Sequence, residues 1–248
     1  MEPAPPCEGP VMTQTSVPEG LRLLTLSRPE KANALDPASV AALAAGVAGA
    51  AAEGAPFAFR AEGRVFCGGF DFTGVETQSE GDLLLRFAHI ELLLQAVSTA
   101  PVVSLALVDG AAFGAGADLV AACTYRLGTP KAKFRFPGFR FGVALGTRRL
   151  AALVGTDTAR AILLENRTLD APEALRAGLL THIVEEADLL ATAGRLLAAH
   201  EGLPPAAAGR ILRLTGADTG DVDLAEMVRS LAPAGLHERI ARYRGQHV

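Results

Sequence analysis

The chain has 248 residues, half of them hydrophobic and 20% charged, which suffices for one large domain or a domain with an appendage. Its formal net charge of −4 argues against nucleic acid as a main partner. No apolar run reaches the roughly 18 residues of a membrane span, and the first residues lack the features of a signal peptide. The three cysteines are too few and too scattered for a disulfide framework or a metal site, so we expect a cytoplasmic protein without a metal.

Prolines and glycines divide the first hundred residues into a few elements. Residues 1–10 contain four prolines and are expected to form a disordered tail. Residues 11–26 are predicted to form two short strands around a turn. Asp36 and Pro37 are a helix-start pair, which predicts a helix to about residue 53 and then a strand at 56–60. A long helix is predicted over 80–98.

The rest of the chain alternates strand-like runs with helices. Short strands are predicted at 102–108, 125–128, 133–137 and 179–184. Helices are predicted at about 115–123, 146–154, 156–164, 171–177 and 186–201. Three further segments predict a helical tail, at 204–214, 222–230 and 236–243.

The stretch 105–123 has the composition of a site for an anionic oxygen. An apolar strand passes through a turn of glycine and alanine into a helix whose first N–H groups are unpaired and carry partial positive charge. Its glycines, at 110, 114 and 116, do not match the spacing of a dinucleotide fingerprint. The alternative is an oxyanion hole, which needs a second donor loop; residues 63–72, with their paired glycines, could supply one.

Three segments carry a family resemblance: RPEKANAL at 28–35, FCGGFD at 66–71 and DGAAFGAGADL at 109–119. In order and spacing they resemble the signature segments of the crotonase family, which includes enoyl-CoA hydratases and isomerases. The resemblance implies an α/β fold of the ClpP/crotonase type, with a ββα spiral core and a C-terminal helical region. We therefore expect a core at 11–195 and an oligomerisation region at 196–248, in a homotrimer or hexamer.

The resemblance also implies site residues. The oxyanion-hole donors would be the backbone N–H groups of Gly68 and Ala115, unless both loops are only tight packing turns. Lys31 would bind a CoA phosphate, or it is simply a solvated lysine. Coenzyme A would belong to the substrate, with no separate cofactor. The other implied substrate-binding residues are Ala32, Ala34, Gly69, Phe70, Asp71, Phe72, Gly114, Pro137 and Gly138.

The acid–base residues depart from the family pattern. Hydratases use two glutamates to orient and deprotonate water and to protonate carbon. The first of these positions is Asp118, shorter by one C–C bond of roughly 1.5 Å, and the second is Gly138. Because a misplacement of about 1 Å can cost around a hundredfold in rate, we do not expect these two positions to support efficient hydration. Asp118 could act as the single base of an isomerase, or it could cap its own helix.

Three more charged residues lie near these segments. Glu91 falls on an apolar face of the predicted helix 80–98, where it could reach the acyl group or form a structural hydrogen bond or subunit contact. Arg135 and Arg140 flank Gly138 and could bind a carboxylate on the acyl group, or they are surface charges.

We therefore expect an acyl-CoA-binding lyase or isomerase of the enoyl-CoA hydratase/isomerase type, as found in fatty acid metabolism. Asp118, with Glu91 as a possible second group, would move the proton. Two alternatives share the scaffold: an acyl-thioester-binding protein without turnover, and an acyl-CoA hydrolase or decarboxylase.

Overall fold

The computed structural model describes residues 17–204 and 206–245. Its larger sheet has five parallel strands in the order β1-β2-β4-β6-β9. These strands are β1 Arg22–Leu26, β2 Phe57–Ala61, β4 Ser104–Val108, β6 Tyr125–Gly128 and β9 His182–Ile183. The strand β4 is buried along its whole length, as expected for a central strand of a parallel sheet.

A smaller sheet of four strands, in the order β3-β5-β7-β8, lies beside the first. Its strands are β3 Val65–Cys67, β5 Ala111–Phe113, β7 Lys133–Arg135 and β8 Thr168–Asp170. The first three are parallel and β8 is antiparallel to β7. Since β3 and β5 lead directly into the two glycine-rich loops, their pairing brings those loops together.

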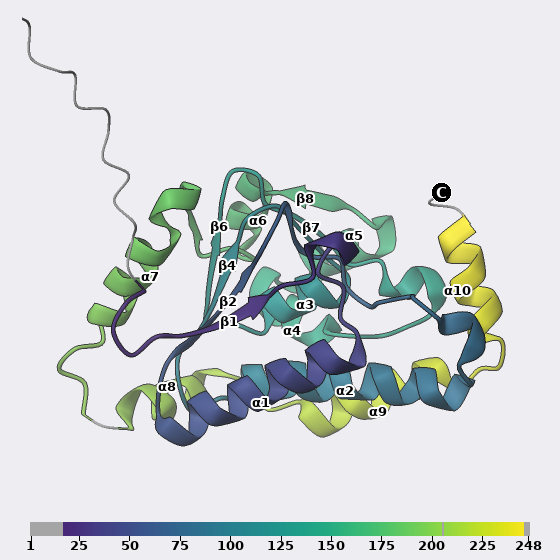
Figure 1. Ribbon diagram of the computed structural model, residues 1–248, viewed down its shortest axis with the longest axis horizontal. Helices are drawn as coiled ribbons and strands as arrows, with labels where there is room; N and C mark the ends of the chain where they lie inside the picture. The colour runs from purple at the N-terminus through teal and green to yellow at the C-terminus, as the bar shows by residue number, and fades with distance from the viewer. Residues whose placement is uncertain (1–16, 205, 246–248) are drawn as a thin grey trace, which may run out of the picture.

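Ten α-helices surround the sheets in the described part of the chain (Figure 1). They are α1 Pro37–Glu53, α2 Glu80–Ser98, α3 Ala115–Ala121, α4 Thr147–Val154, α5 Thr156–Glu165, α6 Ala171–Ala177, α7 Leu189–Ala198, α8 Ala207–Thr215, α9 Gly220–Leu231 and α10 Leu236–Gly245. Short 3-10 helices are η1 Pro29–Lys31, η2 Val75–Thr77, η3 Gly138–Phe141 and η4 Glu186–Asp188. Helices α1, α2 and α9 lie side by side below the sheets, and α10 packs on η3.

Local capping explains why the longest helices begin where the sequence predicts. The Asp36 side chain accepts a hydrogen bond from the Ser39 amide, with Pro37 in the first helical turn of α1. Ser79 and Asp82 form a reciprocal capping box at the start of α2. Both helices turn their buried side chains toward the main core.

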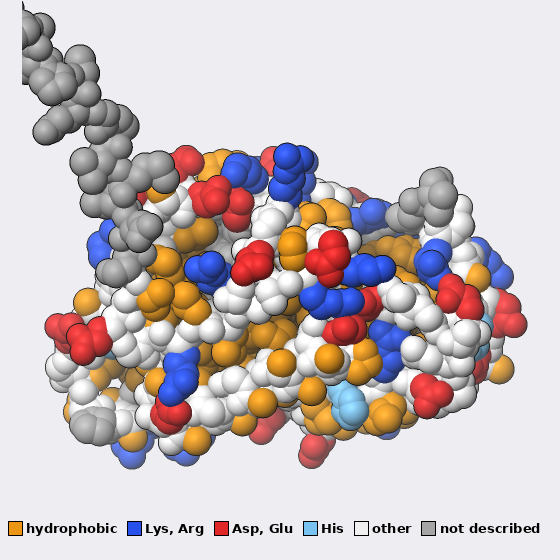
Figure 2. Space-filling view, viewed as in Figure 1, with side chains coloured by type: hydrophobic (Ala, Val, Ile, Leu, Met, Phe, Trp, Pro, Cys, Tyr) orange, Lys and Arg blue, Asp and Glu red, His pale blue; other side chains and the backbone are white. Residues whose placement is uncertain are grey.

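Several predicted boundaries change. Of the two strands expected within 11–26, β1 is present, and residues 11–16 lie outside the described residues, as does the predicted tail at 1–10. The turn of glycine and alanine predicted within 105–123 contains β5, and the helix expected at 186–201 is η4 followed by α7. No described helix is long and apolar enough to cross a membrane. On the face drawn in Figure 2, basic and acidic side chains are interspersed and form no single basic patch.

Candidate active site

The two glycine-rich loops touch at Gly69. This residue has φ +91°, and a Cβ added to it would lie 2.6 Å from the Phe113 carbonyl oxygen and 3.3 Å from the Ala115 nitrogen. Only glycine fits both the backbone conformation and the close approach. The loop after β3 therefore lies directly against the first residue of α3.

The hydrogen bonds of these loops decide which amides are available to a ligand. The Gly68 N–H donates to the Ala32 carbonyl at 2.8 Å, so the prediction that Gly68 supplies an oxyanion-hole donor is wrong. Leu35 forms a parallel bridge with the next part of the loop. Its N–H donates to the Gly69 carbonyl, and its carbonyl accepts from the Asp71 amide. In a parallel bridge of this kind the N–H of the residue between them, here Phe70, faces the other side of the strand.

Two amides at the junction are left without an acceptor. Neither the Phe70 N–H nor the Ala115 N–H donates a hydrogen bond to any described residue. Ala115 follows the N-cap residue Gly114, so its N–H is one of the donors that a helix start leaves unpaired. Phe70 and Ala115 both line one cavity, which makes them the pair of amides that a bound oxygen could reach.

That cavity has a volume of about 230 Å³ and an aromatic lining. It collects eight of the thirteen aromatic residues of the chain: Phe70, Phe72, Phe87, Phe113, Phe136, Phe139, Phe141 and Tyr243. Phe70 stacks on Phe87 with ring centroids 4.2 Å apart, and Phe141 contacts Tyr243 at 5.0 Å. An apolar lining of this kind suits an acyl chain and excludes water from it.

Asp118 is a buried carboxyl group in the wall of the cavity, one turn into α3. Its Oδ1 is buried and has no hydrogen-bond partner among the described residues. Burial raises the pKa of Asp118 well above its usual value; the Arg149 guanidinium opposes that rise and Glu91 adds to it. A carboxyl group with a raised pKa and an unsatisfied oxygen is suited to exchange a proton with a bound substrate.

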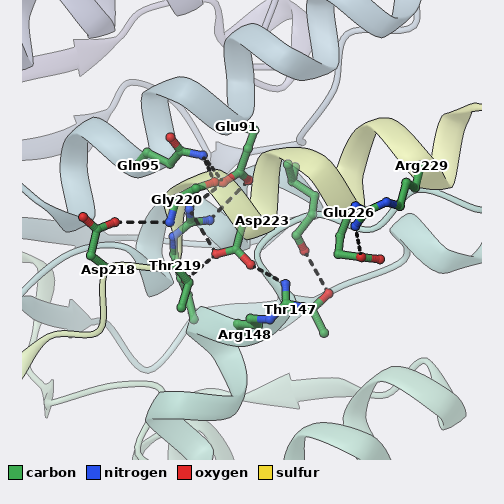
Figure 3. A network of polar contacts seen from close by, with 12 residues as sticks. Glu91, Gln95, Thr147, Arg148, Asp218, Thr219, Gly220, Asp223, Glu226 and Arg229 are labelled. Carbon is green, nitrogen blue, oxygen red and sulfur yellow. Dashed lines mark hydrogen bonds and ion pairs between the residues drawn. The ribbon is translucent and has the colours of Figure 1, made fainter.

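Glu91 lies in a buried ion network that links α2, α4 and α9. It accepts hydrogen bonds from Arg149 at 2.5 and 3.3 Å and from Gln95 at 3.1 Å. Asp223 extends the network, 3.6 Å from Arg149 and 2.7 Å from Arg148 (Figure 3). Both Glu91 oxygens are engaged inside the protein and Glu91 does not line the cavity, so the prediction that it is catalytic is wrong.

Gly138 begins η3 and leaves the second hydratase position without a side chain. A Cβ there would lie 2.8 Å from the Val143 carbonyl oxygen, so any larger residue requires the backbone to shift. The Val143 amide in turn donates to the Gly138 carbonyl at 2.9 Å, which closes this short loop on itself. Among the described residues that line the cavity, Asp118 is the one carboxyl group.

Arg135 and Arg140, which flank Gly138 in sequence, have different surroundings. Arg135 lines the cavity, and its Nε donates to the Asn166 Oδ1 at 3.2 Å. Arg140 is exposed, lies outside the cavity lining and contacts the Leu164 carbonyl at 3.5 Å. The hypothesis of a carboxylate-binding arginine therefore applies to Arg135 alone.

The other predicted substrate-binding residues divide into two groups. Gly68, Phe70, Phe72, Gly114, Pro137 and Gly138 line the cavity with Ala115 and Asp118. Outside it lie Lys31, Ala32, Ala34, Gly69 and Asp71. Asp71 pairs with Arg28 at 3.0 Å and accepts from the Thr73 amide at 2.9 Å, so its carboxylate holds the loop together. Lys31 is exposed on η1, and its contact with a CoA phosphate stays a prediction.

Sequence reasoning missed most of the aromatic lining and the part played by the C-terminal region. Tyr243 comes from α10, a helix assigned from the sequence only to subunit contacts. The signal that could have found the lining is the clustering of a scarce residue type, since phenylalanines gather at 66–72 and 134–141 in a chain with only thirteen aromatic residues.

Comparisons with known proteins agree with this fold. Residues 16–212 match the family model described as enoyl-CoA hydratase/isomerase. The chain is 33% identical over 213 residues to "Probable enoyl-CoA hydratase echA6" of Mycobacterium leprae, covering 83% of this chain and 82% of that protein. It is 32% identical over 177 residues to "Ethylmalonyl-CoA decarboxylase" of Mus musculus, covering 68% of this chain and 54% of that protein.

Solved structures give the same result. The crystal structure of a protein from Bordetella parapertussis, described as an enoyl-CoA hydratase/isomerase, superposes with a TM-score of 0.86 and is 47% identical. The superposition covers 88% of this chain and 92% of the Bordetella parapertussis chain. The architecture is thus the crotonase fold. The chain belongs to the enoyl-CoA hydratase/isomerase family and is an enzyme of that family.

Proposed function

We propose that this enzyme binds an acyl-CoA thioester, stabilises its enolate with the Phe70 and Ala115 amides, and moves one proton with Asp118. The observation that carries the proposal is a buried carboxyl oxygen without a partner, in the same cavity as two amides that have no acceptor among the described residues. Enolate formation places negative charge on the thioester oxygen, and two fixed N–H donors stabilise that charge.

A single acid–base group favours proton transfer between carbons over hydration. Hydration needs a second group to orient and deprotonate water, and Gly138 cannot supply one. Isomerisation needs only one group, which removes a proton from one carbon and returns it to another. The raised pKa of Asp118 supports this role, because a carboxylate whose pKa lies above the usual value is a stronger base and, once protonated, can return the proton to carbon.

The test is exchange of the Cα hydrogens of butyryl-CoA in D₂O, followed by mass spectrometry. We expect the wild-type enzyme to incorporate deuterium and Asp118→Asn to lose at least about a hundredfold in exchange rate, the usual range for a general base. Binding of butyryl-CoA should survive in Asp118→Asn. Full exchange by that variant would contradict the assignment of Asp118.

A second candidate is acyl-thioester binding without turnover, which the missing side chain at Gly138 supports. In that case butyryl-CoA binds the wild type and no deuterium enters over hours. A third candidate, decarboxylation, is supported by Arg135 in the cavity wall and by the decarboxylase among the relatives. It would break the bond between Cα and a carboxylate, release CO₂ and leave the enolate for Asp118 to protonate.

We also propose a homotrimer or hexamer in which residues 196–248 contribute to the subunit contacts. Exposed leucine and isoleucine side chains in and before α8 support this, because Leu203, Ile211 and Leu214 are 43%, 50% and 73% exposed. Light scattering on the purified chain measures the state, and Ile211→Asp with Leu214→Asp should shift it toward the monomer. A cytoplasmic location stays a prediction.

A further inference from the structure

Arg135 is the one cation among the described residues that line the aromatic cavity. Its Nε bonds the neutral side chain of Asn166, and no Asp or Glu in the described part of the chain forms an ion pair with it. Two other arginines of the fold, Arg28 and Arg149, each have a carboxylate within 3.0 Å. Arg135 therefore differs from them in lacking a counter-charge.

The surroundings of Arg135 orient its guanidinium. Asn166 ends α5 in the left-handed conformation, at φ 54°, so the acceptor that holds the Nε is part of a fixed helix cap. The bond to Asn166 uses one of the five N–H donors and leaves the four on the two terminal nitrogens. Those nitrogens match the geometry of a carboxylate, and a partly desolvated guanidinium gains most from such a partner.

The backbone of Arg135 ties this side chain to the proposed oxyanion hole. Its carbonyl accepts from the Gly114 amide at 2.8 Å, and β7 pairs with β5 so that Arg135 stands opposite Phe113. Paired strands lie about 4.8 Å apart, so the backbone of Arg135 in β7 is next to the end of β5, the strand that leads into Ala115. An anion bound by Arg135 must therefore lie close to the thioester, within a cavity of about 230 Å³.

We propose that Arg135 binds a carboxylate carried by the acyl group, so that the substrate is the CoA thioester of a short dicarboxylic acid. The inference rests on the proposed function, because the thioester must first be held at Phe70 and Ala115. Arg135 is then the residue that selects this class of substrate over a plain fatty acyl-CoA. Its bond to Asn166 sets the direction from which the carboxylate enters.

The experiment is calorimetric titration of the full chain with butyryl-CoA, succinyl-CoA and 2-carboxybutyryl-CoA. Charge-assisted hydrogen bonds should make at least one carboxylated thioester bind about tenfold or more tightly than butyryl-CoA. Arg135→Met should remove that preference, so that the carboxylated thioesters bind no more tightly than butyryl-CoA. Arg140→Met is the matched control and should keep the preference, because Arg140 lies outside the cavity lining.

The outcomes separate the inference from the proposed function. If wild-type protein binds butyryl-CoA as tightly as both carboxylated thioesters, or if Arg135→Met keeps the preference, the inference fails and the proposed function stands. If no acyl-CoA binds, both fail. Should Arg135→Met not fold, the wild-type preference and its decrease with added salt decide the question. Tighter binding of either carboxylated thioester than of butyryl-CoA supports the inference. If 2-carboxybutyryl-CoA binds more tightly of the two, the carboxylate that Arg135 binds is at Cα; if succinyl-CoA does, it is at the end of the acyl chain.

Discussion

Removing the Ala115 N–H is the most direct test of the proposed oxyanion hole. Ala115 is the first residue of α3, a position where proline is tolerated because its missing N–H would have no partner inside the helix. The wild-type amide donates to no described residue, so Ala115→Pro removes a donor to the substrate without breaking a hydrogen bond of the fold. Loss of one such donor costs about 2.7–4 kcal/mol of transition-state stabilisation, or about 10²–10³ in rate.

Two variants control for effects unrelated to the amide. Thr156→Pro places proline at the first residue of α5, which also follows a glycine and is exposed, so its exchange rate should match the wild type. Ala115→Gly keeps the amide and should retain exchange within a few-fold. Because Gly69 packs closely on the Ala115 nitrogen, thermal melting of the proline variant must accompany the kinetics.

The assay is deuterium uptake at Cα of butyryl-CoA, measured beside the affinity for the same ligand. The reasoning predicts slow uptake by Ala115→Pro with nearly unchanged binding, since the donor acts mainly on the developing charge. Uptake by a folded Ala115→Pro at more than about a third of the wild-type rate would refute the oxyanion hole. The carbonyl stretching frequency of the bound thioester tests the same point in the wild type, where it should fall below the value in water.

Three further predictions concern stability and reactivity. Because burial raises the pKa of Asp118 in the folded state, the folded chain holds that proton more tightly and loses stability as pH rises above the ordinary value of 3.8. In urea denaturation at increasing pH above that value, the free energy of unfolding of Asp118→Asn should therefore rise relative to that of the wild type, and an unchanged difference would contradict the raised pKa. Glu91→Ala leaves the Arg149 guanidinium, whose side chain is 9% exposed, with only the longer ion pair to Asp223 at 3.6 Å. The free energy of unfolding in urea should therefore fall by up to about 3–5 kcal/mol, the range for a buried charge left without a partner, whereas a loss below about 1 kcal/mol would mean that the pair is solvated. Burial raises the pKa values of Cys67 and Cys123 to about 12. A folded Cys7→Ser variant, which keeps only these two thiols, should therefore not react with a thiol reagent at neutral pH. Rapid labelling would show that one of the two thiols is accessible.

The sequence predicts the long helices well because their signals are local. Asp36 with Pro37 and the pair Ser79 and Asp82 are capping groups that act within one turn, and each helix begins beside them. Three of the four strands of the smaller sheet were missed for the opposite reason, whereas β7 falls within the predicted strand 133–137. β3, β5 and β8 have three residues each, too few to show a period, and they exist because distant segments pair with them.

The same distinction explains the errors at the site. A glycine-rich motif can mark the loop at 66–72, but which amide is available depends on bonds from residues more than thirty positions upstream, Ala32 and Leu35. The sequence also shows that Glu91 needs a partner on its apolar face. That partner, Arg149, comes from another helix 58 residues along the chain, and no local pattern points to it.

Exclusion of water connects the three groups to which we assign function. Burial raises the pKa of Asp118, and the aromatic lining of the same cavity lowers the local dielectric constant around the Phe70 and Ala115 amides, whose N–H groups would there stabilise an enolate oxygen more strongly than in water. In that setting the charge of Arg135 would discriminate between a carboxylate and a methyl group far better than a solvated arginine could. If Arg135 governs substrate choice in this way, Phe141→Ala should weaken both the preference for a carboxylated thioester and the exchange rate, because Phe141 packs on Phe87 and Tyr243 in the cavity wall and its removal admits water.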